Sequence, residues 1–254
     1  MTNTQTDRWL RTFGAPVPSE SPVRLLCLPH AGGSASFYAP LAEALRGRMS
    51  VAALQYPGRQ DRFGEPCPDS IQELADAAVA ALGETVQRPF ALFGHSMGGV
   101  VAYEMAARLQ AAGQSPTALF VSGTAGPLAS RDMGTHLLAD EPFSNELVRL
   151  GATDRELLTG EMRDVVLPMI RADYRAIETY RCTRPHTLAC PLTALVGRDD
   201  PYVTRQEAAR WRVHTTGGFT MRVFPGGHFY LQERFDRVAA AIGAEIGASA
   251  SAGS

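Results

Sequence analysis

The segment "RPFALFGHSMGGVVAYEMAARL", residues 88–109, decides the fold of this chain. Its first half is almost entirely apolar, as in a buried strand, and its second half has the apolar spacing of a helix. Between them lies "GHSMG", residues 94–98, which matches G-x-S-x-G, the pattern of a nucleophile elbow. In such an elbow a serine occupies a strained turn between a strand and a helix. The segment therefore predicts an α/β protein with Ser96 at the end of a central strand. The alternative, a glycine-rich turn without a catalytic role, has to be decided by the rest of the chain.

Length and composition indicate an ordinary globular protein. The 254 residues are 45% hydrophobic and carry a net charge of -2, without the basic concentration that suits nucleic acid. No apolar run approaches the roughly 20 residues that span a bilayer, and the amino-terminal residues lack the apolar core of a secretion signal. We therefore expect a cytoplasmic monomer with one domain over residues 1–254, and no binding to nucleic acid or membranes.

The cysteines give no sign of a metal site or a disulfide framework. They form no C-x-x-C pair and no zinc-binding spacing, which favours thiols in a reducing compartment. The four are Cys27, Cys67, Cys182 and Cys190.

Strand and helix patterns alternate along most of the chain. Apolar runs that end in glycine or proline predict six strands, at residues 23–29, 50–57, 89–95, 118–124, 191–197 and 220–227. Helical patterns lie at residues 37–47, 70–86 and 99–113, and a last one begins near Tyr230. This alternation predicts a mostly parallel sheet with helices on both faces, and a ligand site at the carboxyl ends of the strands.

One segment interrupts the alternation. From about 127 to 184 no convincing strand appears, whereas apolar residues recur at helical spacing from Met162 to Ile177, around a kink expected at Pro168. The simplest interpretation is an extra core helix. Because the segment leaves and rejoins the predicted sheet on the side of Ser96, we favour a helical lid over the site. The last residues, about 247–254, are small and polar and predict a disordered tail.

A catalytic serine needs a base and a group that orients the base. In α/β-hydrolases these follow in the order Ser, Asp or Glu, His. "RDDPYV" follows one predicted strand and "PGGHFYL" the next, so Asp200 and His228 stand in the required order at the same sheet edge as Ser96. The chain has six histidines, and a lone histidine is usually structural. Asp199 is an alternative to Asp200, and either carboxylate alternatively caps the loop.

The oxyanion of an acyl-transfer reaction needs two backbone N–H donors. One is expected from Met97, directly after the nucleophile, and the other from the loop after an early strand. "LCLPHAGGSASFY" supplies that loop, and Ala31 is the predicted second donor. The alternative, a phosphate-binding turn, does not fit because "HAGGSA" lacks the P-loop spacing and lysine. No cofactor or metal is expected in this chemistry.

Seven segments between Trp9 and Phe235 together resemble one protein family. They are "CLPHAGGSASFY", "LQYPGRQDRFGEP", "FGHSMGGVVAYEMA", "ADEPFSNELVRLGATDRELL", "LPMIRADYRAIETY", "VGRDDPYV" and "PGGHFYL". These segments are similar to those of the type II thioesterases that accompany modular polyketide synthases and nonribosomal peptide synthetases. The similarity includes the insertion, which generic α/β-hydrolases do not share.

The resemblance implies an α/β-hydrolase that removes stalled or wrong acyl groups from the phosphopantetheine arm of acyl or peptidyl carrier domains. It implies that Ser96 is the nucleophile and His228 the base, and the family pattern G-x-x-D-P-x-V selects Asp200. Met97 and Ala31 are the implied oxyanion donors. Phosphopantetheine is part of the substrate and not a cofactor. One departure from the family lies in the insertion, at positions 152 and 154, where Ala and Asp replace the commoner Gly and Pro.

Two arginines in "YPGRQDRF", Arg59 and Arg62, are expected either to meet the phosphate of the arm or an acidic carrier surface, or to be solvated loop charges. Other functions remain open at this point. The same fold supports a general thioesterase or esterase and an acyltransferase, and a non-catalytic binding module can keep it too. A chain-terminating domain cut from a synthase is less expected, since the sequence carries no remnant of a carrier domain.

Overall fold

The computed structural model of the chain describes residues 6, 8–13, 23–83, 89–129, 132–151, 153 and 155–252. Within these residues seven strands form one sheet in the order β1-β3-β2-β4-β5-β6-β7. The strands are β1 Leu10–Phe13, β2 Arg24–Leu28, β3 Ser50–Leu54, β4 Phe90–His95, β5 Ala118–Ser122, β6 Leu192–Gly197 and β7 Phe219–Phe224. All neighbours pair in parallel except β1, which runs antiparallel to β3. The predicted mostly parallel sheet is confirmed.

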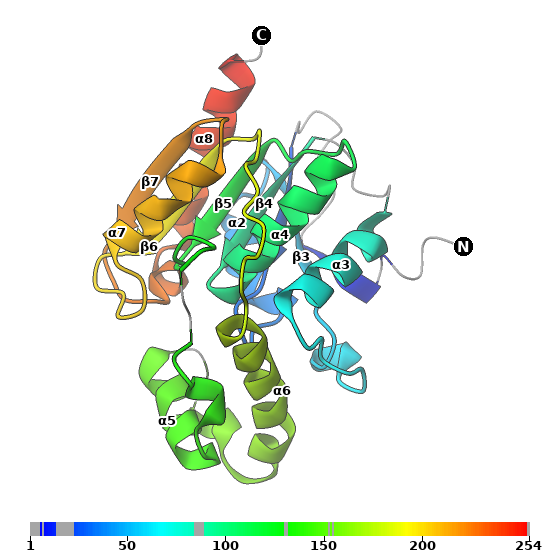
Figure 1. Cartoon of the computed structure of the whole chain (residues 1–254), viewed down its shortest axis with the longest axis vertical. Coiled ribbons are helices and arrows are strands. Elements are labelled where there is room, and N and C mark those ends of the chain that lie inside the picture. The colour runs from blue at the N-terminus through cyan, green and yellow to red at the C-terminus, as the bar shows by residue number, and fades with distance from the viewer. Residues whose placement is uncertain are drawn as a thin grey trace.

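Helices cover both faces of the sheet (Figure 1). On one face α3 and α4 pack on the strands, and on the other face α2 and α8 do so. Every residue of β4, β5 and β6 is buried, which explains why these strands are continuous apolar runs. The α-helices are α2 Ala39–Ala44, α3 Ile71–Leu82, α4 Met97–Ala111, α5 Asp140–Leu150, α6 Gly160–Glu178, α7 Arg205–Ala209 and α8 Phe235–Ala252.

The edge strand β1 has no counterpart among the six strands predicted from the sequence. It is four residues long and none of its residues is fully buried, so it shows no apolar run. Its place in the sheet comes from the backbone ladder with β3, from Leu10 opposite Leu54 to Phe13 opposite Val51.

In the described residues between β5 and β6 there are two α-helices, α5 and α6, which lie beyond one end of the sheet in the lower part of Figure 1. They share a small apolar core of their own, in which Phe143 and Leu147 of α5 meet Leu167 and Ile170 of α6. The helix predicted around Met162 is thus α6, and α5 adds a second one.

The C-terminal helix α8 continues to Ala252, where the sequence predicted a disordered tail from about residue 247. Alanine has the highest helix propensity, and the alanine-rich end extends a helix already anchored by buried Ile242 and Ile246. The last two residues lie outside the described part of the chain. None of the described helices combines the length and the apolar character needed to cross a membrane.

Candidate active site

Ser96 lies between the last residue of β4 and the first residue of α4. Its backbone has a φ of 53°, a left-handed conformation that is unusual for a residue with a side chain. The glycines around it are required by close packing. A Cβ at Gly94 would lie 2.0 Å from the Gly98 carbonyl oxygen, and a Cβ at Gly98 would lie 2.1 Å from the Leu28 oxygen. The strand, the glycines and the strained turn therefore form the elbow that the sequence predicted.

His228 and Asp200 come from the loops after β7 and β6 and meet directly. The Nδ1 atom of His228 lies 2.9 Å from Oδ2 of Asp200. The other carboxylate oxygen of Asp200 accepts hydrogen bonds from the N–H groups of Tyr202 and Val203, at 2.8 and 3.2 Å. The contact turns Nδ1 of His228 toward the carboxylate, so a proton on Nδ1 is donated to Asp200. Asp199 is exposed. The structure thus brings Asp200, and not Asp199, to His228.

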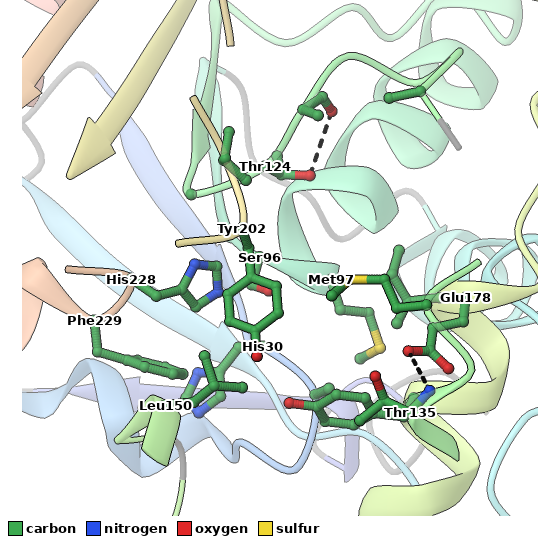
Figure 2. Close-up of a pocket in the computed structure, with 18 of the residues that line it drawn as sticks. His30, Ser96, Met97, Thr124, Thr135, Leu150, Glu178, Tyr202, His228 and Phe229 are labelled. Atoms are coloured by element: carbon green, nitrogen blue, oxygen red, sulfur yellow. Dashed lines mark hydrogen bonds between the residues drawn. The ribbon is translucent and has the colours of Figure 1, made fainter. Parts of the chain in front are cut away.

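Ser96 and His228 line one pocket, where Figure 2 shows the histidine ring beside the serine. Within the described residues no hydrogen bond joins the two side chains. Such contacts often tighten only when the substrate is bound. The wall of the pocket is largely apolar and includes Met97, Ala125, Ala129, Met133, Leu150, Tyr174, Ile177, Tyr202 and Val203.

The two predicted backbone donors belong to the same pocket, which Ala31 and Met97 both line. Ala31 lies in a turn that the Gly33 N–H closes with a 2.9 Å hydrogen bond to the His30 oxygen. In the described part of the chain neither the Ala31 nor the Met97 N–H has an acceptor. Both residues thus border the pocket that Ser96 lines, and neither of their N–H groups is taken up within the described residues.

Two further histidines pack close to His228. The ring centroid of His95 lies 5.1 Å from that of His228 and 6.0 Å from that of His30. Burial, and then repulsion from His228 and Arg59, lowers the pKa of His30 to about 3. Burial also lowers the pKa of His95 well below its usual value, with added repulsion from His228 and His30. Both rings are therefore neutral at pH 7, and among these three His228 alone has a carboxylate partner.

His95 also forms a second serine–histidine contact, with Ser122. Its Nδ1 lies 2.9 Å from the Ser122 hydroxyl, which lies 2.7 Å from the Tyr230 hydroxyl. Ser122 is fully buried and does not line the pocket. We therefore assign this contact to the packing beneath the site, because a buried hydroxyl engaged by two partners cannot reach a substrate.

Arg59 and Arg62 do not face the entrance of the site, so the expectation of phosphate, carrier or solvent contacts is wrong. Both are buried, with 3% and 5% exposure. Arg59 forms two hydrogen bonds with Asp173, and Arg62 bonds Glu65 and the Gln55 oxygen.

Several residues of the site were missed in the sequence. The Tyr202 ring lies 5.6 Å from that of His228, in the loop that also holds Asp200. Glu178, at the end of α6, lines the far side of the pocket and accepts the Thr135 N–H at 3.1 Å (Figure 2). Tyr202 is two residues from Asp200 along the chain, and this proximity could have predicted its place in the site. Nothing in the sequence connects Glu178 with Ser96. The family departures at positions 152 and 154 lie outside the described residues.

Comparisons with known proteins agree with this geometry. Residues 23–246 match the family described as thioesterase domain. A probable cadicidin biosynthesis thioesterase of Streptomyces griseus is 47% identical over 91% of this chain and 64% of its own length. This chain thus spans less than two thirds of that relative. Thioesterase PikA5 of Streptomyces venezuelae is 44% identical over 93% of this chain and 84% of its own length.

A solved structure is similar over almost the whole chain. The type II thioesterase BorB from the borrelidin biosynthetic cluster has a TM-score of 0.87 and 46% identity, covering 96% of this chain and 100% of its own. The match includes the insertion between β5 and β6 as well as the sheet. The chain belongs to the thioesterase family of α/β-hydrolases and, within it, to the type II thioesterases of polyketide and nonribosomal peptide pathways.

Proposed function

We propose that this thioesterase hydrolyses aberrant or stalled acyl groups from the phosphopantetheine arm of acyl or peptidyl carrier domains, with Ser96, His228 and Asp200 as its catalytic triad. The observation that carries the proposal is the 2.9 Å contact of His228 with buried Asp200, in the pocket that Ser96 lines. The likeness to PikA5 and BorB supports a role beside a modular synthase.

Each residue has a defined part in the proposed reaction. Nε2 of His228 takes the proton of Ser96 while Oγ attacks the thioester carbonyl carbon, and the Ala31 and Met97 N–H groups stabilise the resulting oxyanion. The C–S bond then breaks, and His228 returns the proton to the departing pantetheine thiol. A water molecule gives a proton to His228 and attacks the acyl carbon of the acyl-Ser96 ester. The bond between that carbon and Oγ then breaks, His228 returns the proton to Oγ, and the acid leaves. Asp200 keeps the proton of His228 on Nδ1 throughout.

The insertion acts as a lid on a single α/β domain in this proposal. Leu150 of α5 and Tyr174, Ile177 and Glu178 of α6 line the pocket, so the insertion forms part of the acyl-binding wall. An acyl group enters between this wall and the core, and closing the wall excludes bulk water, as lids commonly do.

The triad assignment is tested with Ser96→Ala. Because nucleophile and base act as a unit, removal of the hydroxyl is expected to lower kcat by several orders of magnitude. Turnover of an acyl-carrier substrate is compared with wild type, after circular dichroism has verified that the variant is folded. A folded variant with near wild-type turnover would end the triad proposal.

The carrier preference requires its own experiment. The same acyl group is offered on a carrier protein, on coenzyme A and as a simple oxygen ester, and kcat/KM is compared. The proposal expects clearly higher kcat/KM with the carrier. Equal values for carrier and coenzyme A would leave a general thioesterase, and preference for the ester would leave an esterase. Transfer of the acyl group to an added alcohol or amine in place of water would indicate an acyltransferase.

A further inference from the structure

The buried pair of Arg59 and Asp173 joins the core to the insertion. Arg59 lies in the loop after β3 and Asp173 in the C-terminal half of α6. The two guanidinium nitrogens of Arg59 donate to the two carboxylate oxygens of Asp173 at 2.8 and 2.9 Å. Both residues are buried, with 3% and 4% exposure. Such a bidentate pair, away from water, fixes the geometry of both partners strongly.

The same pair holds the turn that contains Ala31. Oδ2 of Asp173 accepts the Gly32 N–H at 2.8 Å, while Arg59 donates to the Gly33 oxygen at 3.0 Å. The Gly33 N–H is taken by the His30 oxygen. The Gly32 N–H, the Gly33 N–H and the Gly33 oxygen are thus occupied, whereas the N–H of Ala31, which lines the pocket, has no acceptor among the described residues.

Packing adds to this restraint. A Cβ on Gly32 would lie 3.0 Å from Cγ1 of Ile170, so α6 presses directly on the turn. Gly32 also has a φ of 76°. The turn therefore has little freedom to rotate the peptide planes beside Ala31 unless α6 moves with it.

We propose that Asp173 is a positioning residue that sets the oxyanion site from the insertion: together with Arg59 it fixes the Ala31–Gly32 peptide, and through it the direction of the Ala31 N–H. The inference rests on the proposed role of Ala31 as an oxyanion donor. The inference also assigns different roles to two parts of the insertion. The half of α6 around Asp173 stays bound to the core whenever the oxyanion site is ready for catalysis. Lid motion then belongs to α5 and the first turns of α6.

The test is Asp173→Asn, which keeps the shape but removes the charge and one acceptor. Since the oxyanion forms only in the transition state, kcat is expected to fall about 10- to 100-fold with little change in KM, less than on removal of an oxyanion donor itself. Affinity for an acyl trifluoromethyl ketone, whose adduct with Ser96 carries an oxyanion, should fall by the same factor. Affinity for a pantetheine thioether without a carbonyl should not change.

A matched control is Glu104→Gln. Glu104 is also a buried carboxylate paired with an arginine, Arg108, and it accepts the hydroxyl of Tyr180 just beyond α6. It does not touch the Ala31 turn. The control is expected to lower stability while kcat and the affinity for the trifluoromethyl ketone stay at the wild-type values. If Asp173→Asn does not fold, Arg59→Lys carries the test, because it keeps the charge and loses the bidentate geometry.

The outcomes separate this inference from the proposed function. Labelling of Ser96 by a fluorophosphonate and inactivity of Ser96→Ala establish the site first. With those results in hand, wild-type kcat in a folded Asp173→Asn protein would overturn the inference alone. An equal loss of affinity for the ketone and the thioether would also overturn the inference, because it would indicate that Asp173 has a general structural role.

Discussion

At the scale of single residues, Ser96 combines its proposed reactivity with a strained backbone. Its φ of 53° and ψ of -120° lie in a region that side chains disfavour. Such a conformation costs about 1–3 kcal/mol, which the surrounding structure has to supply. Here the backbone around the turn is packed so closely that neither Gly94 nor Gly98 has room for a side chain.

The strain predicts an order of stability among variants at this position. Ser96→Gly removes the side chain that opposes a positive φ, whereas Ser96→Ala keeps a Cβ. We expect Ser96→Gly to be more stable than Ser96→Ala by about 1 kcal/mol, despite the greater freedom of glycine in the unfolded chain. Urea unfolding of both inactive variants measures the difference. If the free energy of unfolding of Ser96→Ala equals or exceeds that of Ser96→Gly, the turn is not strained.

The adjacent carboxylates give a second prediction at this scale. Asp200→Asn is expected to lower kcat about 10³- to 10⁴-fold, because an amide that donates to Nδ1 favours the wrong tautomer of His228. Asp199→Asn is the matched control and should retain nearly full activity, since Asp199 is exposed. Steady-state kinetics on one acyl-carrier substrate compares them. The opposite ranking would transfer the role to Asp199.

What the sequence predicts for single residues depends on whether the partners are local. Ser96 and Asp200 stand in short patterns that follow strands, so their positions follow from the topology. Arg59 looked like an exposed loop charge because its partner, Asp173, is 114 residues away along the chain. An ion pair between distant segments leaves no local pattern, and its burial is visible only in three dimensions.

At the scale of elements, the three fully buried strands β4, β5 and β6 were predictable and the edge strand β1 was not. Strands covered on both faces need apolar side chains at every position, and this requirement marks the sequence. The edge strand β1 buries no residue fully, and it is placed by its hydrogen bonds with β3 and by the packing of Leu10 and Phe13 against the core. The end of α8 was predicted wrongly because its small residues have two interpretations. They are typical of a disordered tail, but they also extend a helix that has already formed.

The Tyr202 side chain joins the loop after β6 to α5. Tyr202 donates to the Glu146 carboxylate and accepts from Arg149 at 2.9 Å, and both partners lie on α5. Its ring meanwhile packs near His228. The position of α5 is therefore coupled to the loop that holds Asp200.

Removing that hydroxyl tests the coupling. In Tyr202→Phe we expect amide hydrogen exchange in α5 to be about tenfold faster, because hydrogen bonds to charged partners are lost, while α3 is unchanged. Tyr174→Phe is the control, since within the described residues the Tyr174 hydroxyl has no hydrogen-bond partner. Mass spectrometry measures the exchange rates of the α5 amides. Equal α5 exchange rates in Tyr202→Phe and Tyr174→Phe would show that apolar packing alone holds α5.

At the scale of the whole molecule, the buried neutral histidines at the site make folding sensitive to acid. The pKa of His30 is about 3 in the folded protein, because of burial and then repulsion from His228 and Arg59, against 6.5 as its usual value. Between these two values the unfolded chain binds more protons than the folded one. Stability is therefore fully present above about pH 6.5 and declines as the pH falls toward 3.

His30→Gln removes one of these buried bases. We expect the loss of unfolding free energy below pH 6.5 to become shallower by up to about 1.4 kcal/mol per pH unit, the value for one proton. Urea unfolding between pH 4.5 and 7 gives the slope. The control, His186→Gln, replaces an exposed ring and should leave the slope as it is in wild type. An unchanged slope in His30→Gln would mean that other groups govern acid unfolding.

The order of the site residues along the chain has a consequence for the life of the protein in the cell. Ser96, Asp200 and His228 follow β4, β6 and β7, and among the described strands β7 is the last along the chain. With His228 as the base, a growing chain has its nucleophile long before it has any means to activate it. Under the proposed mechanism, a chain that ends before β7 keeps Ser96 but lacks His228, so we expect it to hydrolyse no thioester.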